Sequence, residues 1–135
     1  MSDQLVITQH LAEITKTIKS NDITVIRADT GSGKTIKVPH HLAFVESNSV
    51  FCSVPTISST IAAYNFQKKI SAAIDKDHLV GYACEGSKKY NTDTKIVYCT
   101  TGHLVNQVMS CVNDILIGKC NKWFTDVLIL DEFHI

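Results

Sequence analysis

Short apolar runs alternate along the chain with segments whose apolar residues recur at helical spacing. The runs are rich in β-branched residues and apolar throughout, which is typical of strands buried on both faces, and they cover residues 23–28, 50–54, 79–82, 96–100 and 127–130. Helical spacing marks residues 4–19, 34–46, a segment from Ile57 and a segment from Gly102. Strands that alternate with helices predict an α/β fold, with a mostly parallel sheet and helices on both faces.

Turn and cap residues refine these boundaries. Thr56 can cap the helix that begins near Ile57, because its hydroxyl can accept a hydrogen bond from the first turn. Pro39 lacks a backbone N–H and lies inside segment 34–46, so we expect a kink or a short first helix there. The polar stretch 85–94 predicts an exposed hairpin or loop. No repeat or linker interrupts the pattern, so the sequence predicts one domain over residues 1–135.

Composition adds little evidence of a particular partner. The 13 Lys and Arg residues balance the 13 Asp and Glu residues, so any nucleic-acid binding must come from local groups. The five cysteines are odd in number and lack metal-binding spacing, which predicts buried, reduced thiols. The sequence has no signal pattern and no apolar run long enough for a membrane span. We therefore expect a soluble cytoplasmic protein in a reducing compartment, which is the host cytoplasm if the protein is viral.

Residues 28–35, Ala-Asp-Thr-Gly-Ser-Gly-Lys-Thr, follow the first apolar run and predict a phosphate-binding loop of the Walker A type. Glycines leave room for backbone N–H groups to surround phosphate oxygens, and a helix that begins near Gly33 directs its positive end at them. Lys34 would add a charge at the β/γ bridge, and Thr35 would offer its hydroxyl to Mg²⁺. The predicted nucleotide-binding residues are Asp29, Thr30, Gly31, Ser32, Gly33, Lys34 and Thr35. Ala28 stands where the strict pattern has glycine, and a glycine-rich turn before a surface helix is the alternative.

A second motif, Asp131-Glu132-Phe133-His134, follows the last apolar run. Open α/β sheets bind ligands at the carboxyl ends of their strands, which is where these carboxylates would lie. Asp131 would hold Mg²⁺ opposite Thr35, and Glu132 would act as the general base for an attacking water. His134 would sense the phosphate site. A solvated strand end is the alternative for an Asp-Glu pair alone, and the phosphate loop upstream argues against it.

These residues carry a family resemblance. The two motifs resemble motifs I and II of superfamily 2 helicases in the DExH/DEAH branch, which includes DEAH-box proteins and potyviral and flaviviral helicases. Further matches in the same order are Gly-Lys-Thr-Ile-Lys-Val-Pro at 33–39, Val54-Pro55-Thr56 for motif Ia, Val80-Gly81-Tyr82, and Thr100-Thr101-Gly102-His103-Leu104 for motif Ib. The resemblance spans residues 23–134.

The resemblance implies the first RecA-like domain, a P-loop NTPase domain, of an ATP-dependent helicase or remodeller. ATP and Mg²⁺ are the implied cofactors, and Glu132, Lys34 and His134 are the implied catalytic residues. By position, Thr56, Thr100 and Gly102 would contact the backbone of single-stranded nucleic acid, with RNA favoured over DNA.

The chain also departs from the family pattern. Ile57 replaces an arginine of motif Ia, which removes one charged contact, and Phe133 replaces a small residue of motif II, which suggests a divergent, viral member. Motif III, the second RecA-like domain and its arginine finger lie beyond motif II in the family. Since that domain supplies charge that is worth roughly 10³–10⁵ in rate in related systems, we expect weak or no turnover from this chain alone. We expect it to be a fragment, truncated after motif II, or a degenerate relative that retains half the site.

Two other classes of protein stay open at this point. A nucleotide-binding regulatory or scaffold module would keep the P-loop without unwinding activity. A small-molecule P-loop kinase usually needs a lid with arginines, and the only arginine here is Arg27. The run Lys88-Lys89-Tyr90 is either solvated or in contact with a nucleic-acid strand. Trp123 and Phe124 are expected to fill the core.

Overall fold

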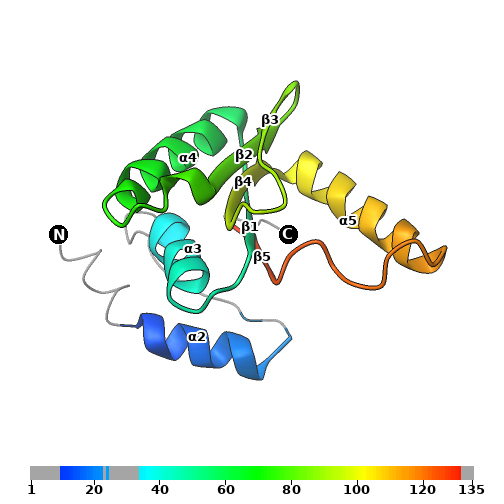
Figure 1. The fold of residues 1–135 in the computed structure, drawn as a ribbon, viewed down its shortest axis with the longest axis horizontal. Helices are drawn as coiled ribbons and strands as arrows, with labels where there is room; N and C mark the ends of the chain where they lie inside the picture. Colours follow the sequence, from blue (N-terminus) through cyan, green and yellow to red (C-terminus); the bar gives the residue numbers. More distant parts are fainter. Residues whose placement is uncertain (1–9, 23, 25–33, 132–135) are drawn as a thin grey trace.

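A computed structural model describes residues 10–22, 24 and 34–131 of the chain. In chain order (Figure 1), its elements are α2 (Leu11–Ser20), α3 (Lys34–Phe44), β1 (Val50–Val54), α4 (Ile57–Ala72), the 3₁₀ helix η2 (Asp77–Leu79), β2 (Val80–Cys84), β3 (Ser87–Lys89), β4 (Ile96–Thr100), α5 (Thr101–Leu116) and β5 (Val127–Leu130). The predicted strand at 23–28 and the first part of the predicted helix at 4–19 lie outside the described residues.

The strands form one sheet with the order β3-β2-β4-β1-β5. All neighbours pair in parallel except β3, which pairs antiparallel with β2 and makes a hairpin from the polar stretch predicted to be exposed. The predicted α/β fold with a mostly parallel sheet is confirmed. The strand predicted at 79–82 is shifted, because Leu79 ends the 3₁₀ helix and pairing with β3 extends the strand to Cys84.

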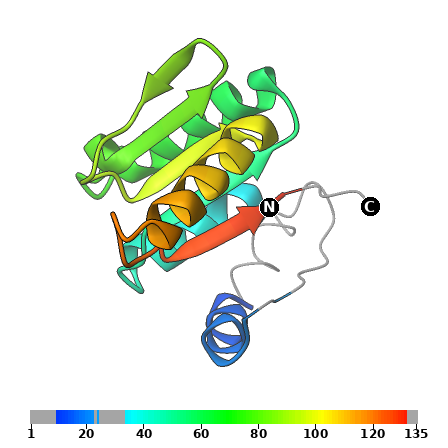
Figure 2. The same cartoon turned by 90° about the vertical axis from the view of Figure 1, so that its right-hand side faces the viewer.

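Alternate residues of β1, β2 and β4 build two cores, one on each face of the sheet, and Figure 2 shows the helices on both faces. Helices α3 and α4 cover the first face, where the largest fully buried side chain is Tyr98 of β4. Helix α5 covers the second face, where Phe51 of β1 packs against Leu104 of the helix. Because both faces of the central strands β1, β2 and β4 are covered, these strands need apolar residues at nearly every position, which explains their continuous runs in the sequence.

The cap predicted for α4 is confirmed, and a threonine that was not predicted as a cap lies at the start of α5. The Thr56 hydroxyl accepts a hydrogen bond from the Ser59 N–H at 3.0 Å, and the Ser59 hydroxyl accepts one from the Thr56 N–H in return. This capping box fixes the start of α4. Thr100 caps α5, which begins at Thr101, one residue before the predicted start at Gly102. Helix α3 continues through Pro39 to Phe44, so the proline does not end it.

Two expectations about burial are wrong. Phe124 packs into the second core, but the neighbouring Trp123 is 52% exposed and does not fill the core. Four of the five free thiols are buried as predicted, whereas that of Cys120 is exposed. Both exceptions lie in the loop between α5 and β5, where few residues are apolar enough to hold the segment against the sheet. None of the helices in the described part of the chain is long and apolar enough to cross a membrane.

Candidate functional site

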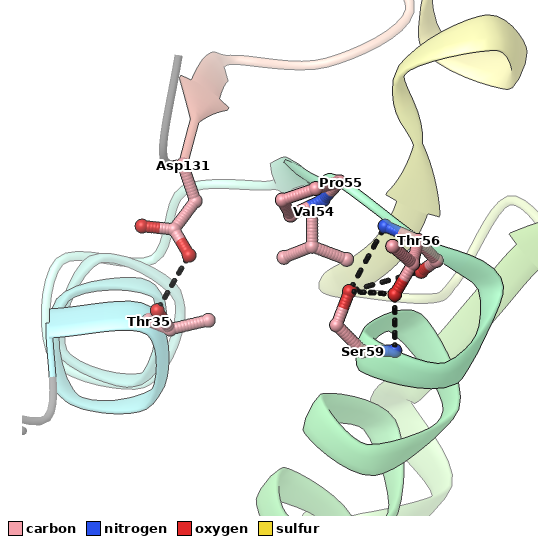
Figure 3. A pocket seen from close by; sticks show the side chains of 6 residues that line it. All are labelled: Thr35, Val54, Pro55, Thr56, Ser59 and Asp131. Atoms are coloured by element: carbon pink, nitrogen blue, oxygen red, sulfur yellow. Dashed lines mark hydrogen bonds between the residues drawn. The ribbon is translucent and has the colours of Figure 1, made fainter. Parts of the chain in front are cut away.

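Two residues that are 96 positions apart in the sequence meet at the carboxyl edge of the sheet. Thr35 lies in the first turn of α3, and Asp131 directly follows β5, where its backbone N–H bonds to the Ser53 carbonyl at 3.0 Å. The Thr35 hydroxyl donates a hydrogen bond to Asp131 Oδ2 at 2.7 Å (Figure 3). Lys34 Nζ lies 3.9 Å from Asp131 Oδ1. The fold therefore brings together the described residues of the two predicted phosphate-site motifs.

The donor atoms at this position suit a hard cation beside phosphate groups. A hydroxyl and a carboxylate provide oxygen ligands, and Mg²⁺ is usually held by one or two protein ligands, with water and phosphate oxygens completing its shell. No group of three or more His, Cys, Asp or Glu side chains that could hold a metal occurs among the described residues. Thr35 and Asp131 thus fit a shared, phosphate-dependent Mg²⁺ site better than a metal site made by protein ligands alone.

A pocket of about 330 Å³ opens beside Thr35 and Asp131. Figure 3 shows these two residues on one side, Thr56 and Ser59 on the other, and Val54 with Pro55 between them. The pocket exists because β1 and β5 are neighbours, so the turn after β1 and the residue after β5 project from the same edge. It connects the predicted metal ligands with the first of the predicted nucleic-acid contacts.

The predicted nucleic-acid contacts lie at helix N-termini on this same edge. The Thr56 hydroxyl is engaged in the α4 capping box, and the Thr100 hydroxyl accepts from the His103 N–H at 3.4 Å. Gly102 lies in the first turn of α5, and a Cβ added there would meet no atom within 4 Å. The space beside Gly102 is therefore open, and contact of Thr56, Thr100 and Gly102 with nucleic acid stays a prediction.

Several predicted site residues fall outside the part of the chain that the structure describes, so their roles stay predictions. They are Asp29, Thr30, Gly31, Ser32, Gly33, Glu132 and His134.

Two buried residues behind Thr35 were not identified from the sequence. The Tyr98 hydroxyl donates to the Thr35 carbonyl at 2.8 Å, and the Gln67 amide donates to the Tyr98 oxygen at 3.1 Å. Burial raises the pKa of the Tyr98 phenol well above its usual range, so this group stays a neutral donor. The available signal was Pro39, whose missing N–H leaves the carbonyl four residues earlier, that of Thr35, without its usual helical partner.

The predicted basic and aromatic run also has a defined arrangement. Lys88 Nζ lies 4.5 Å from the centre of the Tyr90 ring, and the Tyr90 hydroxyl is 3.2 Å from His103 Nε2. Burial lowers the pKa of His103, and the charge of Lys88 adds to that effect. The segment Lys88–Tyr90 therefore contacts the first turn of α5 through His103. Whether it is simply solvated or binds a nucleic-acid strand stays open.

The sequence is similar to segments of several proteins that are named as ATP-dependent RNA helicases. It is 33% identical over 128 residues to the probable ATP-dependent RNA helicase spindle-E of Culex quinquefasciatus, covering 90% of this chain and 8% of that protein. It is 32% identical over 134 residues to the ATP-dependent RNA helicase TDRD9 of Homo sapiens, covering 96% and 9%. It is 27% identical over 143 residues to the ATP-dependent RNA helicase DHX29 of Mus musculus, covering 97% and 10%. The chain thus spans about a tenth of the length of these relatives. No protein-family model matches it.

Proposed function

We propose that this chain forms the ATP-binding part of a DExH/DEAH-type ATP-dependent RNA helicase, because it is similar over most of its length to one segment of proteins named as ATP-dependent RNA helicases. The observation that carries the proposal is the 2.7 Å hydrogen bond between the Thr35 hydroxyl and Asp131. It joins the two motifs that ATP hydrolysis requires, and Lys34 lies beside them.

Each residue of the site would have a separate role during hydrolysis. The Lys34 ammonium would leave Asp131 to bind the β- and γ-phosphate oxygens, while Thr35 and Asp131 would hold the metal. When bound, Mg²⁺ would neutralise charge on the phosphates. Glu132 would accept a proton from the attacking water, as in the helicases that motif II resembles.

We further propose single-stranded RNA as the polymer, running along the carboxyl edge of the sheet past Thr56, Thr100 and Gly102. The RNA-helicase names of the relatives support RNA over DNA. Full turnover would need a second RecA-like domain of the same full-length protein, because one wall of the site supplies too little positive charge to the γ-phosphate. The five free thiols support a reducing, intracellular location.

The test is the equilibrium binding of a fluorescent ATP analogue, with and without Mg²⁺. Lys34→Ala should weaken binding by about tenfold or more in both conditions, because it removes a charged donor to the phosphates. Asp131→Asn should remove most of the gain that Mg²⁺ gives. Lys88→Ala, which removes an equal charge from a distant hairpin, is the control. Unchanged binding in Lys34→Ala would overturn the proposed nucleotide site.

A second measurement separates the helicase from a regulatory nucleotide-binding module. In the full reading frame that contains this chain, single-stranded RNA should stimulate ATP hydrolysis, and Glu132→Gln should remove turnover while binding persists. Nucleotide binding without any RNA-stimulated turnover would favour the regulatory module.

A further inference from the structure

Pro39 creates a specific gap in the hydrogen bonds of α3. In an uninterrupted helix, the N–H of residue 39 would donate to the Thr35 carbonyl, but proline has no N–H. The Tyr98 hydroxyl, which comes from β4, donates to this carbonyl instead at 2.8 Å. Both Pro39 and Tyr98 are fully buried, so water is not a ready substitute for the phenol. A side chain of the sheet thus replaces a missing backbone bond in the turn that carries Thr35.

Gln67 of α4 holds the phenol in place, and its amide orientation is fixed by its neighbours. Its nitrogen lies 2.8 Å from the Ile36 carbonyl, which can only accept, so this end of the amide must be the donor. The same nitrogen donates to the Tyr98 oxygen at 3.1 Å. The Tyr98 hydrogen is therefore free to point only at Thr35.

The other end of the amide is equally occupied. Gln67 Oε1 accepts from the Ser71 hydroxyl at 3.1 Å and from His40 Nδ1 at 2.8 Å, so the His40 ring carries its hydrogen on Nδ1. Gln67 is 0% exposed and all of its hydrogen-bonding positions are used. Such a fully satisfied buried network is rigid, since moving any member leaves another without a partner.

We propose that Tyr98 and Gln67 are positioning residues of the nucleotide site, which hold the first turn of α3 so that the Thr35 hydroxyl faces Asp131. The expected effect on ATP affinity rests on the proposed function, because it requires that Thr35 and Asp131 form part of an ATP site. Mg²⁺ demands nearly ideal octahedral geometry, so a small shift of Thr35 should weaken the metal-dependent part of nucleotide affinity. Lys34 acts as a flexible point charge, so the metal-independent part should change little.

The primary test compares Tyr98→Phe with Tyr90→Phe. Each variant removes one hydrogen-bonded phenolic hydroxyl, and the Tyr90 hydroxyl bonds to His103 on the opposite face of the sheet. Affinity for a fluorescent ATP analogue is measured with and without Mg²⁺, well below each melting temperature. In Tyr98→Phe the gain from Mg²⁺ should fall about fivefold, the size expected for one lost hydrogen bond. In Tyr90→Phe it should not change.

A rescue distinguishes positioning from general loosening of the core. Pro39→Ala restores an N–H that can donate to the Thr35 carbonyl, so it should recover most of the Mg²⁺ gain in the Tyr98→Phe background. Gln67→Met, which keeps the side-chain volume but loses the amide, should lower the gain in the same direction. Equal losses in Tyr98→Phe and Tyr90→Phe, or no rescue by Pro39→Ala, would overturn the proposal.

Hydrogen exchange tests the held turn without any ligand. Amide exchange in residues 36–38 should accelerate in Tyr98→Phe, return toward the original rate with Pro39→Ala, and stay unchanged in Tyr90→Phe. If the unaltered chain binds no nucleotide, the proposed function fails, and these exchange rates alone decide whether Tyr98 holds the turn. Unchanged exchange in Tyr98→Phe would contradict the proposal in either case.

Discussion

Helices α4 and α5 have the same length and each follows a parallel strand, but they bury different kinds of side chain. Each has 16 residues, each follows a parallel strand, and each is capped by a threonine. Helix α4 buries three polar side chains, Thr60, Gln67 and Ser71, all 0% exposed. Helix α5 buries only Leu104 and Cys111, and it leaves Met109 and Leu116 largely exposed.

The difference shows that the burial of a helix residue in this fold depends more on which elements pack around its helix than on whether its side chain is apolar. Helix α4 packs against the sheet and also against its neighbour α3, so even its polar residues lose contact with water (Figure 1). They remain stable there because each finds a hydrogen-bonding partner. Helix α5 packs on the sheet along one side only (Figure 2). The side chains of α4 therefore form hydrogen bonds that reach the first turn of α3, whereas α5 contributes mainly apolar packing.

The largest effect is expected from Leu104→Ala on α5. Leu104 is 4% exposed in the second core, so its truncation should lower the free energy of unfolding by about 2–5 kcal/mol. The neighbouring Val105 is 52% exposed, and Val105→Ala should change stability by less than about 0.5 kcal/mol. Urea denaturation measures both. Equal effects in the two variants would mean that α5 does not pack as described.

Gly81→Ala should have the next largest effect. A Cβ at this position would lie 2.4 Å from the Lys89 carbonyl oxygen and 2.8 Å from Tyr90 Cβ, so the β2–β3 hairpin would have to move. We expect a loss of about 1–3 kcal/mol, as for other overpacked sites. Gly102→Ala is the matched control, because it has open space and lies in a helix, where alanine is favoured by about 0.5–1 kcal/mol. A neutral Gly81→Ala would contradict the close approach.

The two helix caps provide a smaller and more direct comparison. Thr56→Ala removes the 3.0 Å bond from the Ser59 N–H to the Thr56 hydroxyl, which is one half of the capping box, and we expect a loss of about 1 kcal/mol. Thr100→Ala removes one bond of 3.4 Å, so its cost should be smaller. The midpoints and slopes of denaturant unfolding give both values. A larger loss of stability in Thr100→Ala than in Thr56→Ala would contradict the prediction that the α4 cap is the stronger one.

The smallest effect concerns the ion pair that joins α2 to the end of α3. The hydrogen bond from Lys19 lowers the pKa of Glu46, so the pair adds stability above the unfolded-state pKa of about 4.3. That contribution is lost as pH falls through the lower folded-state pKa. Glu46→Gln should therefore reduce the melting temperature slightly at neutral pH and not at about pH 2. The same reduction at both pH values would exclude the ion pair as its cause.

Much of the sheet was predictable because burial on both faces leaves a strong local signal. The strands at 50–54, 96–100 and 127–130 match their predicted bounds. The first two lie inside the sheet and must be apolar nearly throughout, whereas Leu128 and Leu130 of β5 are exposed in the described part of the chain. The end of β2 was not predictable, because it depends on pairing with β3. Trp123 was misjudged for a related reason: an aromatic residue is buried only where the fold offers a surface to cover it.

The sequence by itself predicted the α/β class, the alternation of strands and helices over residues 34–131, and the proximity of Thr35 and Asp131, whose shared phosphate site stays a prediction. These follow from local patterns of polarity and from motifs whose chemistry requires each other. Only the tertiary structure decided that α4 is the more buried helix, and that Tyr98 supplies the hydrogen bond that Pro39 cannot. Such contacts join residues 31 to 63 positions apart, and no local pattern encodes them because each depends on how helix and strand are packed.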